Sequence, residues 1–151
     1  MANLDFKSDL KLGNDGEMFV VSFLETKGLK YLSSNDDNKY DIVMCDKDGI
    51  ELTYEIKTDV KCAPLFDTGN IFIEFESRGK DSGIVVTQAD WFVTYFKYLN
   101  EAWFIKSDKL KELIQENDFP IFKDAGDVGS ATHGYLIKRK DFKKYFYVCK
   151  I

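Results

Sequence analysis

Hydrophobic and polar positions alternate with two different periods along the chain, and these periods predict its helices and strands. A helix is expected over about residues 15–27, because Val20, Val21 and Leu24 form one apolar stripe there. Gly28 follows at a position where helices often end. Strands are expected in four segments, YDIVMCD, IELTYEIKT, NIFIEFES and EAWFIKS, which begin at residues 40, 50, 70 and 101.

Two further helices are expected in the second half of the chain. The first begins at Thr87, with Asp90 three residues later as in a capping box, and continues through DWFVTYFKYL. The second is SDKLKELIQEN, capped by Ser107 or Asp108. The tail, GYLIKRKDFKKYFYVCK, is expected to contain a strand and a basic terminal stretch. The resulting order, α-β-β-β-α-β with additions, predicts an α/β or α+β domain around a mixed sheet.

The segment DIVMCDKDGIELTYEIK has the pattern of a β-hairpin, and the length of its loop decides which side chains meet. A two-residue loop, Asp-Gly, would place Asp41 opposite Ile56. A three-residue loop over residues 47–49 has Gly at the left-handed position that such turns favour, and it places Asp41 opposite Glu55. We prefer the longer loop because it gathers the large apolar side chains on the other face, namely Ile42, Met44, Leu52, Tyr54 and Ile56.

Composition narrows the classes of function. The 151 residues are 44% hydrophobic and 31% charged, as in an ordinary globular protein. No apolar run reaches the roughly 18 residues of a membrane span, and no signal-peptide stretch is visible, so a soluble, cytoplasmic protein without a membrane partner is expected. Three cysteines without CxxC spacing argue against zinc knuckles and disulfide frameworks. A single histidine leaves carboxylates and lysines as the candidates for catalysis.

The acidic pair formed by the three-residue loop predicts a cation site. Directly opposed residues have Cβ atoms roughly 5 Å apart, and like charges in that arrangement are destabilising. Asp41 and Glu55 would therefore need a positive group between them, and Mg²⁺, with Mn²⁺ as a substitute, prefers such oxygen ligands. Lys57 lies two residues past Glu55 on the same face. The alternative is a solvated strand surface, which explains most isolated ExK triplets.

This order of elements and residues resembles the PD-(D/E)XK nuclease superfamily, whose fold is called restriction-endonuclease-like. The matching residues are Asp41 for the first acid, Glu55 for the second and Lys57 for the lysine, while Tyr40 replaces the proline of the family name. The similarity covers about residues 13–106. Within it, FESRGKDSGIVVTQADWF looks like the same region in phage-encoded endonucleases of this superfamily.

The resemblance implies an αβββαβ core with a central mixed sheet flanked by helices. One nuclease domain would occupy residues 1–151, with residues 107–151 as a C-terminal helix and basic strand extension. Many members of the superfamily act as homodimers, because two paired sites can cut two strands, and a homodimer is expected here on the same basis.

The resemblance also implies further members of the site. Glu17, at the start of the first helix, is placed like the additional helix acid of Holliday-junction resolvases, although the helix dipole favours an acid there regardless of function. The backbone carbonyl of Ile56 would be a further metal ligand. Gln88 begins the expected second helix, where related nucleases carry an active-site polar residue; an ordinary exposed residue is the alternative. Glu74 and Glu76 share one strand face and are interpreted as supporting or surface residues.

DNA is the expected partner, and two basic groups are candidates for contacting it. Arg78 and Lys80 lie in a glycine-bearing loop that could hold a phosphate, with a plain charged turn as the alternative. The densest basic stretch, with tyrosines interleaved, comprises Lys138, Arg139, Lys140, Lys143 and Lys144. Charge runs are usually solvated faces, but a chain of net charge −5 would need such a local patch to bind phosphates.

The activity implied by the resemblance is that of a Mg²⁺-dependent deoxyribonuclease. Such an enzyme would be an endonuclease that hydrolyses DNA phosphodiester bonds, selective for junction or branched DNA and similar to phage-encoded enzymes. Two alternatives stay open: a non-catalytic nucleic-acid-binding module on the same fold, and a nuclease directed at RNA.

Overall fold

The computed structural model describes residues 15–35, 39–123, 125 and 131–151. Its elements in chain order are α2 (Asp15–Thr26), β1 (Lys30–Ser34), β2 (Ile42–Cys45), β3 (Glu51–Asp59), β4 (Asn70–Ser77), β5 (Lys80–Asp81), the 3₁₀ helix η1 (Gly83–Val85), β6 (Trp91–Phe96), β7 (Glu101–Lys106), α3 (Ser107–Glu116), β8 (Ile121–Phe122), β9 (His133–Lys138), α4 (Arg139–Phe142), the 3₁₀ helix η2 (Lys143–Tyr145) and β10 (Tyr147–Lys150).

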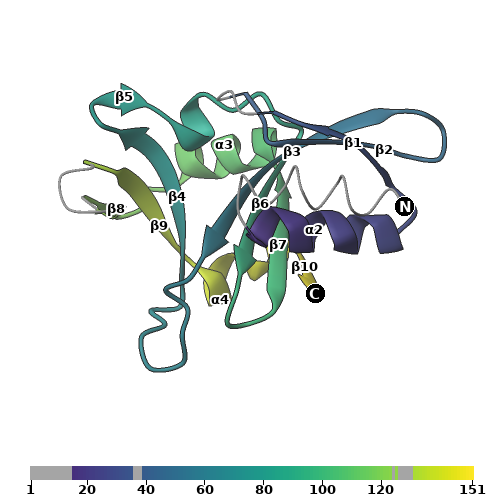
Figure 1. Cartoon of the computed structure of the whole chain (residues 1–151). Coiled ribbons are helices and arrows are strands. Elements are labelled where there is room, and N and C mark those ends of the chain that lie inside the picture. The colour runs from purple at the N-terminus through teal and green to yellow at the C-terminus, as the bar shows by residue number, and fades with distance from the viewer. Residues whose placement is uncertain (1–14, 36–38, 124, 126–130) are drawn as a thin grey trace.

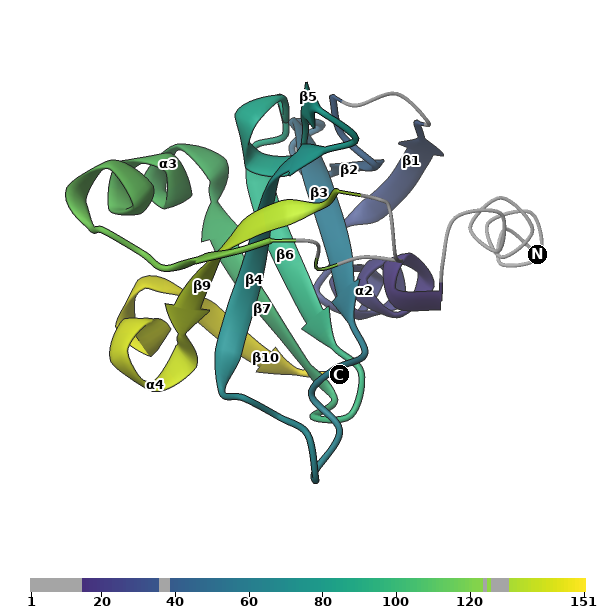
Figure 2. The same ribbon diagram turned by 90° about the vertical axis from the view of Figure 1, so that its left-hand side faces the viewer.

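The described strands form two sheets. The larger has the order β1-β2-β3-β6-β7-β10 and is mixed, because β3 and β6 run parallel while the other neighbours are antiparallel. The smaller has the order β5-β4-β9-β8. Figures 1 and 2 show the helix α2 beside the larger sheet and the strands β4 and β9 on another side of it. The expected α+β class with a mixed sheet is confirmed.

Two hydrophobic clusters cover the two faces of the larger sheet. On one face, Val20, Val21 and Leu24 of α2 pack with alternate strand residues that include Tyr54 and Ile56. The cluster on the other face joins the intervening residues to the smaller sheet and α3, and its members include Ile71, Ile73, Phe92, Phe96, Leu110 and Ile137. Because successive strand residues point to opposite faces, Glu55 and Lys57 lie on the face away from α2.

The hairpin register predicted from the three-residue loop is confirmed. Ile42 pairs with Tyr54 and Met44 with Leu52, and the Asp46 N–H donates to the Ile50 carbonyl at 3.0 Å. Gly49 adopts a φ of 80°, the left-handed conformation that an L side chain rarely takes. The predicted apolar face of this hairpin also holds, since its members all belong to or pack against the α2 cluster.

The helix expected from Thr87 through residue 99 is wrong, because this segment contains strand β6. β6 lies in the interior of the sheet between β3 and β7 and is covered on both faces, so nearly all its residues are apolar and no alternation is visible. Asp90 forms no capping box. Its Oδ2 accepts hydrogen bonds from the N–H of Thr53 at 2.9 Å and from the Thr53 hydroxyl at 3.0 Å.

The remaining predicted helices and strands are present, but β1, β5, β8, α4 and β10 are not among the predicted elements. The helix expected over 15–27 is α2, and the one expected over 107–117 is α3, although neither Ser107 nor Asp108 caps α3. The third strand is β4, which joins the smaller sheet instead of the central one. The expected core boundary near residue 13 lies outside the described residues. In the described part of the chain, no helix combines the length and apolar character of a membrane span.

One ion pair ties the connection between β3 and β4 to the start of α4. The Arg139 guanidinium pairs with Asp67, donates to the Asn70 carbonyl at 3.1 Å and lies 4.8 Å from the centre of the Phe96 ring. Burial alone would raise the pKa of Asp67, but the hydrogen bond and charge of Arg139 outweigh it and lower that pKa below its ordinary value. The pair therefore stabilises the fold when Asp67 is ionised.

We expect Asp67→Asn to lower the free energy of unfolding at pH 7 by about 1–2 kcal/mol, because it weakens a charge-assisted hydrogen bond. A carboxyl with a lowered folded-state pKa stabilises above its unfolded pKa and loses this contribution as pH falls through the folded value. Urea unfolding at pH 7 and pH 3 should therefore show a difference that shrinks in acid. Asp48→Asn, at an exposed turn, is the control; equal effects of both variants would contradict the assignment.

Candidate active site

The hairpin brings together the three residues expected to form the catalytic cluster. Asp41 directly precedes β2, and its N–H donates to the Tyr54 carbonyl at 2.9 Å. Its Oδ2 accepts a hydrogen bond from the Ile56 N–H at 2.8 Å. Asp41 is therefore held by the two residues of β3 that flank Glu55, namely Tyr54 and Ile56. Asp41 therefore lies near enough to Glu55 for its charge to act on that carboxyl group.

Lys57 and Glu55 form an ion pair on the same face of β3, with 3.1 Å between Nζ and Oε2. The Glu55 side chain is only 8% exposed, whereas that of Lys57 is 40% exposed. The second carboxylate oxygen, Glu55 Oε1, is buried and has no hydrogen-bond partner among the described residues. An unsatisfied buried carboxylate oxygen is costly, so it marks a place where a cation or a proton would bind.

Burial and neighbouring charges shift the pKa values of all three residues of this cluster. Burial raises the pKa of Asp41, although the Ile56 N–H and Lys57 oppose the shift. Burial also raises the pKa of Glu55, and the charges of Asp41 and Glu74 add to it against the opposing effect of Lys57. For Lys57, burial alone would lower the pKa, but Glu55, Asp41 and Glu74 outweigh it and raise the net value. The site is therefore a concentration of negative charge around one ammonium group.

Glu74 is the member of the site that sequence reasoning only partly identified. It comes from β4 in the smaller sheet and lines the same pocket as Lys57. The chain at Gly83 lies close against the Glu74 backbone, since a Cβ at that position would come within 2.2 Å of the Glu74 carbonyl oxygen. The expectation that Glu74 and Glu76 share one strand face is wrong, because the pairing of β4 with β9 shifts register between them: Glu74 pairs with Gly134 and Glu76 with His133. Paired residues lie on the same face, and Gly134 and His133 are consecutive, so Glu76 lies on the other face of β4, 3.5 Å from His133.

The carboxylates of Asp41 and Glu55 supply some, but not all, of the oxygen ligands that a divalent cation such as Mg²⁺ takes. The charge of Asp41 raises the pKa of Glu55, and one oxygen of Glu55 is buried without a partner in the described region. Mg²⁺ takes oxygen ligands, often one or two carboxylates, and keeps several waters. Residues 15–35, 39–123, 125 and 131–151 contain no group of three or more acidic, histidine or cysteine side chains arranged as a metal site. Asp41 and Glu55 are therefore the candidate protein ligands.

Glu17 and Gln88 stay predicted members of the site. Glu17 is half-buried in the first turn of α2, the helix that packs on the opposite face of the sheet from Glu55 and Lys57. Gln88 is exposed in the segment before β6, and its N–H donates to the Lys39 carbonyl at 2.6 Å. It thus neighbours the chain just before Asp41 but does not begin a helix. The Ile56 carbonyl stays a predicted ligand, while the Ile56 N–H orients Asp41.

The basic candidates do not form one surface. Lys80 pairs with Ser77 at one end of β4, and Lys138 pairs with Asn70 at the other. An eight-residue strand separates these ends by roughly 23 Å at the usual rise per residue. Figure 1 accordingly shows β5 and α4 at opposite ends of the molecule. Arg78 is exposed beside β5, and the exposed lysines near α4 are Lys138, Lys140, Lys143 and Lys144.

Arg139 differs from these lysines. Its side chain is only 13% exposed and is held by Asp67, Asn70 and Phe96. The guanidinium therefore anchors the fold from inside. The exposed lysines near α4 are therefore the remaining candidates for phosphate contacts in this part of the molecule.

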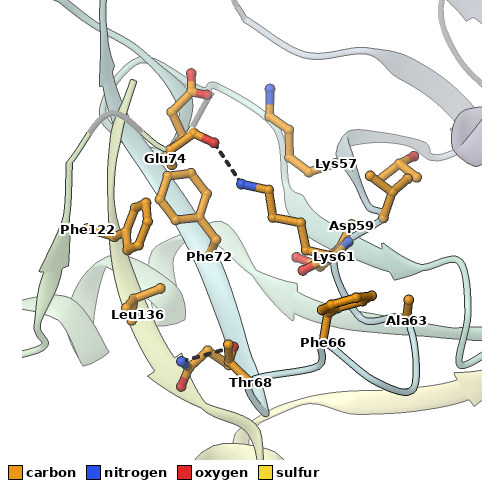
Figure 3. A pocket seen from close by; sticks show the side chains of 15 residues that line it. Lys57, Asp59, Lys61, Ala63, Phe66, Thr68, Phe72, Glu74, Phe122 and Leu136 are labelled. Atoms are coloured by element: carbon orange, nitrogen blue, oxygen red, sulfur yellow. Dashed lines mark hydrogen bonds between the residues drawn. The ribbon is translucent and has the colours of Figure 1, made fainter. Parts of the chain in front are cut away.

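A pocket of about 680 Å³ begins at Lys57 and extends between β3 and β4. Its walls include Asp59, Lys61, Phe66, Phe72, Glu74, Phe122 and Leu136. Figure 3 shows Lys57 and Glu74 at the same end of this pocket and Thr68 at the other. Lys57 and Glu74 therefore line a cavity, which sequence reasoning did not predict because its walls come from both sheets.

Comparisons with known proteins assign no family to the chain. No protein-family model matches the chain, and no curated protein matches it. Among solved structures, it is similar to that of a bacterial homing endonuclease, I-Ssp6803I, with a TM-score of 0.48 and 21% sequence identity. The similarity covers 64% of this chain and 68% of that one. A likeness at this TM-score does not assign the fold, and the chemistry of the site rests on the residues described above.

Proposed function

We propose that this chain is a metal-dependent endonuclease that hydrolyses DNA phosphodiester bonds. The observation that carries the proposal is the convergence of Asp41, Glu55 and Lys57. One acid is held by the Ile56 N–H at 2.8 Å, and the other is paired with the lysine at 3.1 Å. The unpartnered buried oxygen of Glu55 is the feature that a plain solvated strand surface does not explain.

Each residue has a separate task in this mechanism. Asp41 and Glu55 would hold a divalent cation, Mg²⁺ or Mn²⁺, which when bound supplies Lewis acidity for the phosphate and the attacking water. The Ile56 N–H fixes the Asp41 carboxylate, so that ligand needs little reorganisation. Lys57, whose side chain is more exposed than that of Glu55, would donate a hydrogen bond to the phosphate oxygens where negative charge grows in the transition state.

The finer substrate preference rests on the motif resemblance. Junction or branched DNA is the proposed substrate, and a homodimer would present two sites to two strands. The exposed lysines near α4 and the pair Arg78 and Lys80 would then contact different parts of a DNA molecule, because they lie at opposite ends of β4. Phosphate contacts of this kind position the DNA and do not read its sequence.

We expect Lys57→Met to reduce the cleavage rate by about 100-fold or more, because it removes a donor to the developing charge and keeps the apolar stem. The measurement is plasmid nicking in Mg²⁺ at fixed salt. Lys47→Met, at the exposed turn of the same hairpin, is the matched control and should cut at the wild-type rate. A Lys57→Met protein that cuts as fast as this control would refute the catalytic assignment.

A second expectation concerns metal binding without DNA. Mg²⁺ or Mn²⁺ should raise the unfolding free energy of the wild type, by about 2.7 kcal/mol at 100 times the dissociation constant. Asp41→Asn should lose this gain while staying folded, because Asn can still accept the Ile56 hydrogen bond. Glu51 is an exposed acid at the start of β3, the strand that carries Glu55, and Glu51→Gln should keep the gain. Thermal unfolding scans in chelator and in metal give the result; a full gain in Asp41→Asn would contradict the site.

A substrate panel distinguishes the proposal from its alternatives. Four-way junction, single-stranded, duplex and RNA substrates would be incubated with and without Mg²⁺. We expect metal-dependent cutting of DNA, fastest on the junction. Tight binding with no metal-dependent cutting of any substrate would favour a non-catalytic binding module, and cutting confined to RNA would favour an RNA-directed nuclease.

A further inference from the structure

The pocket between β3 and β4 is larger than phosphodiester hydrolysis requires. Protein interiors are close-packed and have few voids larger than a water molecule, so a pocket of about 680 Å³ is far larger than an ordinary packing defect. Its volume falls within the usual range for small-molecule sites. One end is formed by Lys57, the residue proposed to contact the scissile phosphate. Whatever fills the pocket is therefore next to the reacting group.

The walls of the pocket present several aromatic rings. Phe66, in the connection between β3 and β4, is 76% exposed, and Phe122 of β8 is 45% exposed. Phe72 of β4 is half-buried. Figure 3 shows Phe72 and Phe122 on one side of the hollow and Phe66 on the other. Flat apolar rings on two sides suit a planar, ring-shaped ligand, because every nucleobase has a face that can stack on an aromatic side chain.

The polar groups of the pocket are distributed along its length. Lys57 and Glu74 lie at one end, and Thr68 lies at the other. Asn70 is also part of the wall, and its amide donates to the Thr68 hydroxyl at 3.2 Å. Lys61 donates to the Ala125 carbonyl at 2.8 Å. A ligand with an anionic group near Lys57, a flat ring beyond it and hydrogen-bonding edges at the far end would match this order.

We propose that the pocket receives one unpaired nucleobase of the strand whose phosphate is held at Lys57. A nucleotide has this order of groups, since a single sugar joins its phosphate to its base. A base inside a duplex is stacked and paired and cannot enter a side pocket, so the preferred substrate carries an unpaired or flipped nucleotide beside the scissile bond. The inference rests on the proposed function in one respect, namely that Lys57 contacts the phosphate.

The test uses binding of a single-stranded DNA oligonucleotide in Ca²⁺, which takes oxygen ligands as Mg²⁺ does and so offsets the negative charge around Lys57. A gel of the recovered DNA checks that the oligonucleotide is uncut. The wild type should bind it at least about 10-fold more tightly than the blunt duplex at the same salt concentration. Phe66→Ala and Phe122→Ala should each weaken binding of the single strand by about 5- to 150-fold, the range found for loss of one stacked base. The dependence of binding on salt should stay unchanged, because no phosphate contact is removed.

Two matched controls lie next to these phenylalanines. Leu65 is 89% exposed and Ile121 is 52% exposed, and neither lines the pocket. Leu65→Ala and Ile121→Ala should bind within about 2-fold of the wild type. No binding of the single strand, equal binding of the duplex, or the same loss in the controls as in the phenylalanine variants would overturn the inference.

A parallel cleavage assay separates this inference from the proposed function. Binding that depends on both phenylalanines, together with no cutting in Mg²⁺, would support the base pocket and overturn the endonuclease proposal. Mg²⁺-dependent cutting that is equally fast on fully paired DNA, with the phenylalanine variants matching their controls, would overturn the base pocket and leave the endonuclease proposal standing.

Discussion

The three-residue turn between β2 and β3 is the constraint on which the candidate site depends. Asp46 closes it, because its Oδ1 accepts hydrogen bonds from the N–H groups of Asp48 and Ile50, each at 2.9 Å. Gly49 supplies the left-handed conformation that the turn needs. One residue fewer in this loop would shift the register and send one of the two acids to the other face of the sheet. A local turn thus decides whether Asp41 and Glu55 can act together.

The two faces of β3 have different roles: one packs into the hydrophobic core, and the other carries the candidate catalytic residues. Tyr54 and Ile56 pack beneath α2 and hold the strand in the core. Glu55 and Lys57 point the other way, where burial and neighbouring carboxylates make ionised acids costly. Among the described residues, Lys57 is the group paired with Glu55, and it contacts only one of the two carboxylate oxygens. A cation or a proton would balance the excess negative charge, and the proposed metal binding is the first of these two cases.

The hairpin and the placement of its acids are predictable from neighbouring residues in the sequence. The pairing of strands that are far apart in the sequence is not. The register followed from turn residues and from the partition of apolar side chains, both of which are short-range features. β6 was mistaken for a helix because a strand buried on both faces loses its alternation. The smaller sheet pairs Asn70 with Lys138, and Arg139 pairs with Asp67 from 72 residues away, so neither could be inferred from neighbouring residues.

The position of a bound metal ion tests the central claim most directly. Crystals of the protein soaked in Mn²⁺ would give an anomalous difference map in which the ion is located without reference to activity. The structure predicts a peak between the carboxylates of Asp41 and Glu55, within reach of Lys57. Manganese bound only at other acidic groups, with these two carboxylates left without an ion, would contradict it.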